Sequence, residues 1–300
     1  MQNIIAAKNE VWKIKPQTKE DWKKFSDIFY ESGSQNVKNL IEYYKVEITD
    51  ETINNVPCYW VRPNGKYDKD KVLIFLHGGG YVFGYGKSSL TESVYMAWVN
   101  GYQVLAIDYR MASEYPYPAA VDDALAVYKE ILKKFDNKKI GVFGTSTGGG
   151  MTLILTQMAK DNKLPLPSAI APLTPWTDVA KIGDSYYTNE KVDNSLVSYD
   201  GWLEDATKAY ANGHDLKDPY LSPVYGDTTV FPPTLLVSGT SDLFLSCTVR
   251  MQQNLLEHNV PTNLIVYEGQ SHAQYYFGFN TEETLFHFKN LKNFFNKNLK

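Results

Sequence analysis

The chain has 300 residues, of which 43% are hydrophobic and 21% are charged, and its formal net charge is -4. This is an ordinary soluble globular composition with enough material for a large core, in one large α/β domain or two smaller ones. The lysines are scattered without a basic stripe, which argues against an electrostatic nucleic-acid binder.

The first eight residues have neither the basic start nor the long apolar core of a signal peptide. No run in the chain approaches the ~18 apolar residues that a membrane span needs. Cys58 and Cys247 lie in apolar stretches without CxxC spacing, so two buried free thiols are expected rather than a disulfide or a metal site. We therefore expect a reduced, cytoplasmic location.

Residues 17–44 are expected to form the first helix. Thr18 opens a capping-box pattern, and Trp22, Phe25 and Phe29 then fall on one helical face. Such a face fits either a helix packed on the main core or a lid element, because the segment precedes the strand series.

Short apolar runs alternate with helical patterns through the rest of the chain. Strands are expected at residues 43–49, 58–62, 72–76, 104–109, 140–143, 168–171, 234–238 and 263–267. Helices are expected at about residues 88–100, 119–135, 148–161, 246–258 and 282–298. The later strands are almost wholly apolar, as parallel strands covered on both faces are. The alternation predicts a doubly wound α/β sheet with right-handed crossovers.

One stretch, between Pro175 and Pro232, contains no convincing strand. From Tyr199 to Tyr210 the apolar residues keep helical spacing, and Gly213 could end that helix. Inserted helices above one sheet favour a single domain with a cap over two independent domains.

The most informative stretch runs from Phe143 to Gly150 and contains Gly144-x-Ser146-x-Gly148 between a predicted strand and a predicted helix. A nucleophilic serine on a strained turn needs small neighbours, so that strand and helix approach closely and the Oγ stays exposed. Such a serine requires an oxyanion hole encoded upstream, followed by an acid and a histidine downstream in that order.

The upstream requirement is met by His77-Gly78-Gly79-Gly80, directly after a predicted strand. Consecutive glycines let main-chain N–H groups turn toward one point. With the N–H of Thr147, the residue after the serine, they could hold a tetrahedral oxyanion. A phosphate-binding turn is the alternative, but neither glycine pattern of nucleotide-binding loops is present there.

The downstream acid is expected directly after a late strand, and Asp242 follows the strand at residues 234–238. Among the five histidines, His272 alone lies after the acid on a loop that follows the last strand; His77 is expected to brace the glycine turn. Other acids in or near the inserted stretch lack a preceding strand and are expected to be solvated surface charges. These include Asp178, Asp184, Asp193, Asp200, Asp215, Asp218 and Asp227.

Together these motifs resemble the α/β-hydrolases of the hormone-sensitive-lipase group of esterases. The run from Asp108 to Ala120 is similar to that group's DYRLAPE and P-x-P-A-A motif, and the resemblance spans roughly residues 43–295. It implies an α/β-hydrolase fold: a mostly parallel central sheet with helices on both faces and a helical cap.

The same resemblance implies a single catalytic domain over residues 1–300, with cap elements at about 1–42 and 177–220. The implied activity is that of a serine carboxylesterase, which hydrolyses small or short-chain esters through an acyl-enzyme without metal or organic cofactor. Carried over by position, the site consists of the nucleophile Ser146, the acid Asp242, the base His272 and the oxyanion donors Gly79, Gly80 and Thr147, with Gly78 not excluded.

The chain departs from the usual Gly-Asp-Ser-Ala-Gly at two positions. Thr145 removes a charge beside the nucleophile, and Thr147 places a branched side chain next to the oxyanion hole, where it would narrow the acyl site. Ser113 replaces the usual proline, and Ala273 follows the histidine where an aromatic residue is common. None of these changes removes a reacting group, so they leave the substrate preference open.

Tyr81, Phe83 and Trp176 are candidate substrate-binding residues near the glycine turn and after the sixth strand, with plain core packing as the alternative. A lactonase, amidase or peptidase would use the same catalytic residues. A non-catalytic small-molecule receptor is a further alternative, and the presence of His272 argues against it. The expected partner is a small ester, not a nucleic acid or a membrane, and the last helix with its edge strand could support a homodimer.

Overall fold

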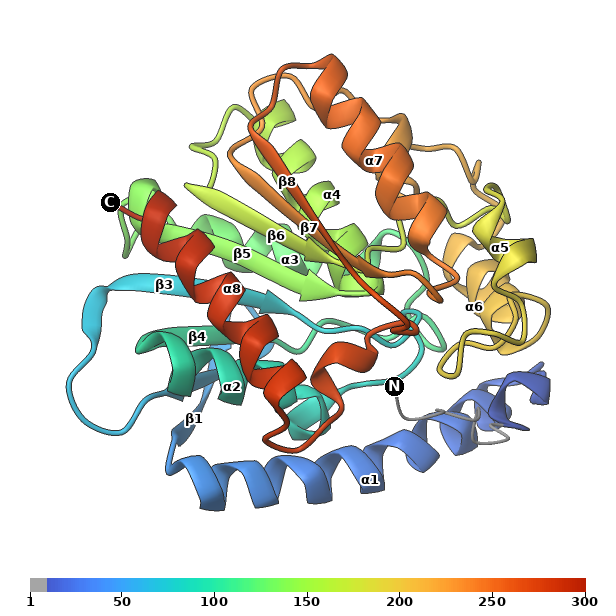
Figure 1. Cartoon of the computed structure of the whole chain (residues 1–300), viewed down its shortest axis with the longest axis horizontal. Helices are drawn as coiled ribbons and strands as arrows, with labels where there is room; N and C mark the ends of the chain where they lie inside the picture. Colours follow the sequence, from blue (N-terminus) through green and yellow to red (C-terminus); the bar gives the residue numbers. More distant parts are fainter. Residues whose placement is uncertain (1–9) are drawn as a thin grey trace.

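A computed structural model describes residues 10–300 (Figure 1). Its centre is an eight-stranded sheet in the order β1-β2-β4-β3-β5-β6-β7-β8. The strands are β1 (Glu47–Ile53), β2 (Val56–Arg62), β3 (Asp68–Leu76), β4 (Tyr102–Ile107), β5 (Ile140–Thr145), β6 (Ala169–Leu173), β7 (Thr234–Gly239) and β8 (Thr262–Tyr267). β2 pairs antiparallel with β1 and β4, and the other neighbouring strands are parallel. The eight predicted strands and the mostly parallel sheet are confirmed.

Helices cover both faces of this sheet, as predicted. They are α1 (Lys19–Tyr44), α2 (Thr91–Asn100), α3 (Ala119–Ile131), α4 (Thr147–Asp161), α5 (Ser185–Thr188), α6 (Trp202–Ala211), α7 (Leu245–Glu257) and α8 (Glu282–Asn298). Short 3-10 turns are η1 (Glu10–Lys13), η2 (Gly86–Ser89), η3 (Asn137–Lys139), η4 (Pro223–Tyr225) and η5 (Gln274–Tyr276). In Figure 1, α2 and α8 lie in front of the sheet, and α3 and α4 lie behind it.

The central strand β3 shows why both faces must be covered. Ile74 and Leu76 belong to the apolar cluster that includes α3 and α4, whereas Leu73 and Phe75 belong to the cluster with α2 and α8. Successive strand side chains point to opposite faces. A strand that is apolar at every position is therefore stable only between two helix layers, and each fully buried side chain of this size contributes about 1.5–3 kcal/mol.

Helix α1 begins and ends on clear local signals. The Thr18 side chain accepts from the Asp21 N–H, and the Asp21 side chain accepts from the Thr18 N–H, so the predicted capping box is present. The helix ends at Tyr44, and the next residue, Lys45, caps it in the left-handed conformation with φ 53°. The strand predicted from residue 43 therefore starts only at Glu47: aromatic Tyr44 favours a strand locally, but it is buried as part of the helix.

The inserted stretch contains no strand in the structure, in agreement with the prediction. Its main helix, α6, ends at Ala211 and is capped by the left-handed Asn212 (φ 47°) rather than by Gly213, and the short α5 was not predicted. The N-terminal segment meets this insertion, since a Cβ on Gly201 would lie 1.9 Å from the Trp12 carbonyl oxygen. Figure 1 shows α5, α6 and the start of α1 at one end of the sheet.

The cap boundaries at 1–42 and 177–220 stay a prediction, and the first nine residues of that cap, with the predicted absence of a signal peptide, lie outside the described residues. Within residues 10–300, no helix has both the length and the apolar character needed to cross a bilayer. Cys58 and Cys247 are buried free thiols, as predicted.

Candidate active site

Ser146 lies on the turn between β5 and α4. Its backbone has φ 61° and ψ -120°, a conformation that residues with a side chain rarely adopt. The turn is fixed on both sides: the Ser146 N–H donates to the Leu173 carbonyl at 2.9 Å, and its carbonyl accepts from the Trp176 N–H at 3.0 Å. A Cβ on Gly148 would lie 1.9 Å from the Leu76 carbonyl oxygen, so glycine is required where α4 passes the end of β3.

The glycine turn, residues 77–80, follows β3 and lies at the same cavity as this serine. Gly79 and Gly80 have φ 121° and 61°, which favour glycine, and both line a cavity together with Gly78. His77 supports the turn, because its Nδ1 lies 2.7 Å from the Gly78 carbonyl oxygen and its ring stacks on Tyr109 with centroids 4.0 Å apart. Burial lowers the pKa of His77, so the imidazole is neutral and its Nδ1–H donates to that carbonyl.

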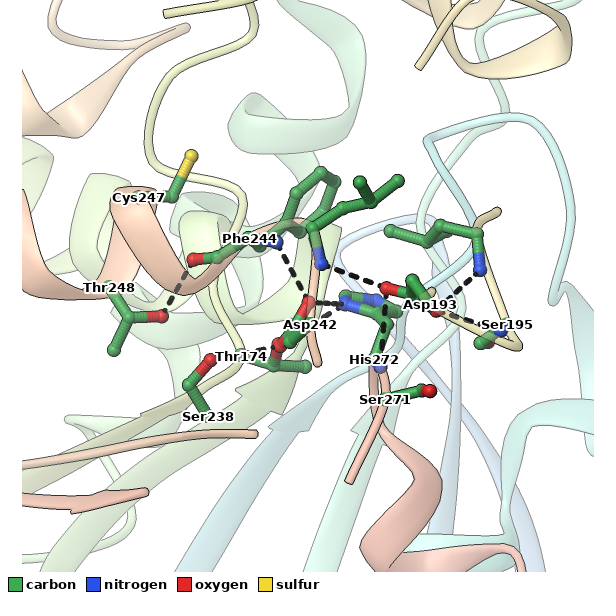
Figure 2. Close-up of polar contacts among 12 residues, drawn as sticks. Thr174, Asp193, Ser195, Ser238, Asp242, Phe244, Cys247, Thr248, Ser271 and His272 are labelled. Carbon is green, nitrogen blue, oxygen red and sulfur yellow. Dashed lines mark hydrogen bonds and ion pairs between the residues drawn. The ribbon is translucent and has the colours of Figure 1, made fainter. Parts of the chain in front are cut away.

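Asp242 and His272 lie side by side at the ends of β7 and β8 (Figure 2). His272 Nδ1 lies 3.0 Å from Asp242 Oδ1, and both side chains are buried. The same Oδ1 accepts from the Phe244 N–H at 2.8 Å, while Oδ2 accepts from the hydroxyls of Ser238, at 3.0 Å, and Thr174. These donors fix the carboxylate against the imidazole, which leaves Nε2 as the ring nitrogen available for proton transfer.

A cavity of about 710 Å³ is lined by Ser146 and His272. The glycine turn forms one wall, α1 adds Phe29 to a second, and the insertion adds Leu196 and Trp202 to a third. Within residues 10–300, no group of three or more histidine, cysteine, aspartate or glutamate side chains is placed to hold a metal ion.

Of the three candidate substrate-binding residues, only Phe83 lines this cavity. Tyr81 stacks on Tyr210 with centroids 3.5 Å apart and is 2% exposed. Trp176 is also 2% exposed and stacks on Phe244 at 5.5 Å. The structure therefore corrects two of the three: Tyr81 and Trp176 belong to the buried core, where their rings pack against Tyr210 and Phe244.

A family model described as alpha/beta hydrolase fold matches residues 73–276 of the chain. The chain belongs to this α/β-hydrolase family. The resemblance inferred from the glycine turn, the serine turn and the order of acid and base is thereby confirmed, and it rests on a match to more than half of the sequence.

Named relatives of this α/β-hydrolase include bacterial esterases. It is 30% identical to an acetyl-hydrolase of Streptomyces hygroscopicus over 227 residues, which cover 75% of each chain. Among solved structures, the esterase E25 matches with a TM-score of 0.93 and 37% identity, over 97% of this chain and 89% of that one. An esterase from the bacterial hormone-sensitive lipase family matches with a TM-score of 0.85 and 26% identity, over 97% and 95% of the two chains.

The prediction of solvated surface charges is wrong for two acids of this hydrolase. Asp178 is 0% exposed and pairs with Arg250, and Asp193 is 1% exposed. Asp193 lies beside the proposed acid and base. Its Oδ2 accepts from the N–H groups of Leu243, at 2.8 Å, and His272, at 3.4 Å (Figure 2). Its Oδ1 accepts from the consecutive N–H groups of Ser195 and Leu196, at 2.7 and 3.0 Å. Burial raises the pKa of Asp193 to about 6. One carboxylate thus joins the insertion to the loops that carry Asp242 and His272.

Glu92 is a further buried acid, and its burial is not predictable from the sequence pattern. It is 3% exposed, lines the cavity from α2 and accepts a short hydrogen bond from the Thr145 hydroxyl. Thr145 precedes the serine, at the position where the related motif has an aspartate. A carboxyl group is therefore still present beside the serine turn, but burial raises the pKa of Glu92 to about 8 and keeps it neutral at pH 7.

This raised pKa predicts a pH-dependent stability that Glu92→Gln removes. Below about pH 4.5 the Glu92 carboxyl is protonated in both the folded and the unfolded chain. Between about pH 4.5 and 8 only the folded chain holds this proton, so the free energy of unfolding falls by up to about 1.4 kcal/mol per pH unit. Above about pH 8 the fall levels off. Since the glutamine amide cannot ionise, we expect the free energy of unfolding of the wild type, relative to the variant, to fall by roughly 3 kcal/mol from pH 5.5 to 8.

Urea titrations of both proteins at the two pH values measure this difference. Glu31→Gln, on the exposed side of α1, is the matched control and should follow the wild type at both pH values. Parallel pH curves for the wild type and Glu92→Gln would show that Glu92 is ionised in the folded chain.

Proposed function

We propose that this α/β-hydrolase is a serine carboxylesterase that cleaves small or short-chain carboxylic esters through an acyl-enzyme. The observation that carries the proposal is the 3.0 Å contact between His272 Nδ1 and the buried Asp242 carboxylate, at a cavity that Ser146 also lines. The names of the relatives, which include acetyl-hydrolase, esterase and, in Pseudomonas putida, ethyl acetate hydrolase, support ester hydrolysis.

In the first half-reaction, Ser146 Oγ attacks the ester carbonyl carbon and His272 Nε2 takes up the hydroxyl proton. Asp242 holds Nδ1 and stabilises the imidazolium that forms. The carbonyl oxygen becomes an oxyanion, for which Gly79 and Thr147 are proposed as main-chain donors together with Gly80. His272 then donates its proton to the leaving alcohol, and the acyl group stays on the serine.

In the second half-reaction, water replaces the alcohol. His272 Nε2 takes a proton from this water as the water oxygen attacks the acyl carbon, and a second oxyanion forms in the same place. The proton then passes to Ser146 Oγ as the bond between Oγ and the acyl carbon breaks and the carboxylic acid product leaves. The two residues that exchange the proton in this scheme, Ser146 and His272, line the same cavity.

A fluorophosphonate probe tests the nucleophile directly. We expect wild-type protein to gain one covalent phosphonyl group on the peptide that contains Ser146, and Ser146→Ala to gain none. Ser241→Ala, which removes the serine of the nearby Gly-Thr-Ser sequence, should be labelled like the wild type. An unlabelled wild type would contradict the proposal and favour a non-catalytic receptor, and labelling of Ser146→Ala would place the nucleophile elsewhere.

The finer assignments belong to the same proposal. A panel of esters, lactones, amides and peptides separates the carboxylesterase from a lactonase, amidase or peptidase, and the best turnover is expected on short-chain esters.

Location and assembly are separate parts of the proposal. The free thiols Cys58 and Cys247 fit a reducing cytoplasmic compartment. We also propose a homodimer through α8 and the edge strand β8, without nucleic-acid partners, in keeping with the scattered lysines and the net charge of -4.

A further inference from the structure

The side chain of Thr147 makes an unexpected contact inside the proposed oxyanion hole. The N–H of Gly80, one of the proposed donors, donates to Thr147 Oγ1 at a distance of 2.6 Å. Thr147 is fully buried and, unlike Gly80, does not line the cavity. The hydroxyl therefore approaches the glycine turn from the protein side and does not narrow the acyl site, which corrects the expectation from sequence.

This contact matters because a main-chain N–H carries one hydrogen. An N–H that points at a hydroxyl oxygen cannot give the same hydrogen bond, with the same geometry, to an oxyanion in the cavity. The Thr147 hydroxyl and the oxyanion are thus competing acceptors for the Gly80 N–H, whereas the Thr147 N–H, on the backbone at the start of α4, is unaffected by this contact.

The glycine turn has little freedom to escape this competition. A Cβ on Gly80 would lie 2.7 Å from Trp202 Cζ3 of α6, and a Cβ on Gly78 would lie 2.9 Å from the Thr145 carbonyl oxygen. The turn is therefore packed between α6 and the serine turn, and Thr147 Oγ1 can leave the N–H most easily by rotation of its own side chain. Such a rotation needs no movement of the backbone.

We propose that Thr147 is a positioning residue that limits the rate: its hydroxyl holds the Gly80 N–H in the resting enzyme, so the transition state must displace it to gain that donor. This inference rests on the proposed esterase function. Loss of one oxyanion donor typically costs about 10²–10³ in turnover. Because a charged oxyanion competes well against a neutral hydroxyl, we expect the hydroxyl to cost only about tenfold.

Two substitutions at this position separate the hydroxyl from the branched shape. Thr147→Val keeps the shape and removes the acceptor, and Thr147→Ser keeps the hydroxyl. With p-nitrophenyl acetate we expect Thr147→Val to raise kcat/KM by about tenfold, and Thr147→Ser to match the wild type within about threefold.

A trifluoromethyl ketone gives a readout that a purely structural role would not move, because it forms an oxyanion when the serine adds to it. We expect its Ki to fall in Thr147→Val by the same factor as kcat/KM rises, while inhibition by the corresponding methyl-ether analogue, which forms no oxyanion, stays unchanged. Since valine leaves the Gly80 N–H without its partner in the free enzyme, the melting temperature of this variant should also fall. If Thr147→Val does not fold, Thr147→Ala gives the same test.

The outcomes are distinct. A Thr147→Val variant with unchanged or lower kcat/KM and unchanged or weaker ketone binding would overturn this inference, and a lower value would mean that the hydroxyl orients the N–H productively. If the wild type neither hydrolyses p-nitrophenyl acetate nor reacts with the fluorophosphonate probe, the proposed function itself fails.

Discussion

Replacing Asp242 with asparagine is expected to lower kcat by roughly 10³–10⁴-fold with the fold intact, a loss of the size seen when the acid of a serine-protease triad is replaced. The surroundings favour one orientation of the new amide. Its oxygen can accept from the Phe244 N–H and from His272 Nδ1, while its NH₂ faces the hydroxyls of Ser238 and Thr174, which can rotate to accept. The variant thus keeps the imidazole in place but lacks the charge that stabilises the imidazolium.

Steady-state hydrolysis of p-nitrophenyl acetate measures this loss, and KM should change little because the cavity walls stay in place. Asp178→Asn is a control of equal burial: this carboxylate pairs with Arg250 at 2.7 Å and accepts from the Tyr225 hydroxyl at 2.7 Å, and it does not line the cavity. We expect Asp178→Asn to reduce stability but to keep kcat within about threefold. An Asp242→Asn variant with more than a tenth of wild-type activity would refute Asp242 as the acid.

The fold and the central residues of the candidate site could be predicted because their signals are local. Each parallel strand is a short apolar run, and each of Ser146, Asp242 and His272 follows such a run within a few residues. The carboxyl ends of parallel strands meet at one edge of a sheet, so the chain order of these three residues already placed them near one another. The position of a residue after a strand predicts where its backbone lies, but it does not predict the direction in which a neighbouring aromatic ring points. Tyr81 and Trp176 are therefore close to the site in sequence but packed away from it.

Asp193 and Glu92 could not be found in the same way, because their partners are distant in sequence. Asp193 meets Leu243 from fifty positions away, and Glu92 meets Thr145 from fifty-three. Weak signals did exist. Asp193 accepts from the N–H two residues on, an Asx turn that its position in Asp-Asn-Ser-Leu permits, and Glu92 is a single acid in an otherwise uncharged helical stretch. Neither signal predicts that the acid is buried, because its burial depends on which elements of the fold cover it.

The close approach of α4 to the end of β3 at the serine turn predicts a second large effect. Gly148→Ala should lower the free energy of unfolding by at least about 3 kcal/mol, and the variant protein that still folds should also have a lower kcat. The added methyl group would lie 1.9 Å from the Leu76 carbonyl oxygen and 2.6 Å from that of His77. Both obstacles are backbone atoms at the end of β3, which no side-chain rotation can clear. Either α4 moves away from β3 with Ser146 or β3 moves with the glycine turn, so stability and the spacing between the proposed nucleophile and the proposed oxyanion donors change together.

Urea unfolding and the rate with p-nitrophenyl acetate measure these two effects on the same preparation. Gly226→Ala is the matched control, because its φ of -80° suits alanine and the nearest atom to the new Cβ, the Pro223 carbonyl oxygen, is 3.2 Å away. This control should change stability by less than about 1 kcal/mol and leave kcat unchanged. A Gly148→Ala variant as stable and active as Gly226→Ala would mean that α4 and β3 do not approach as closely as the packing of the serine turn requires.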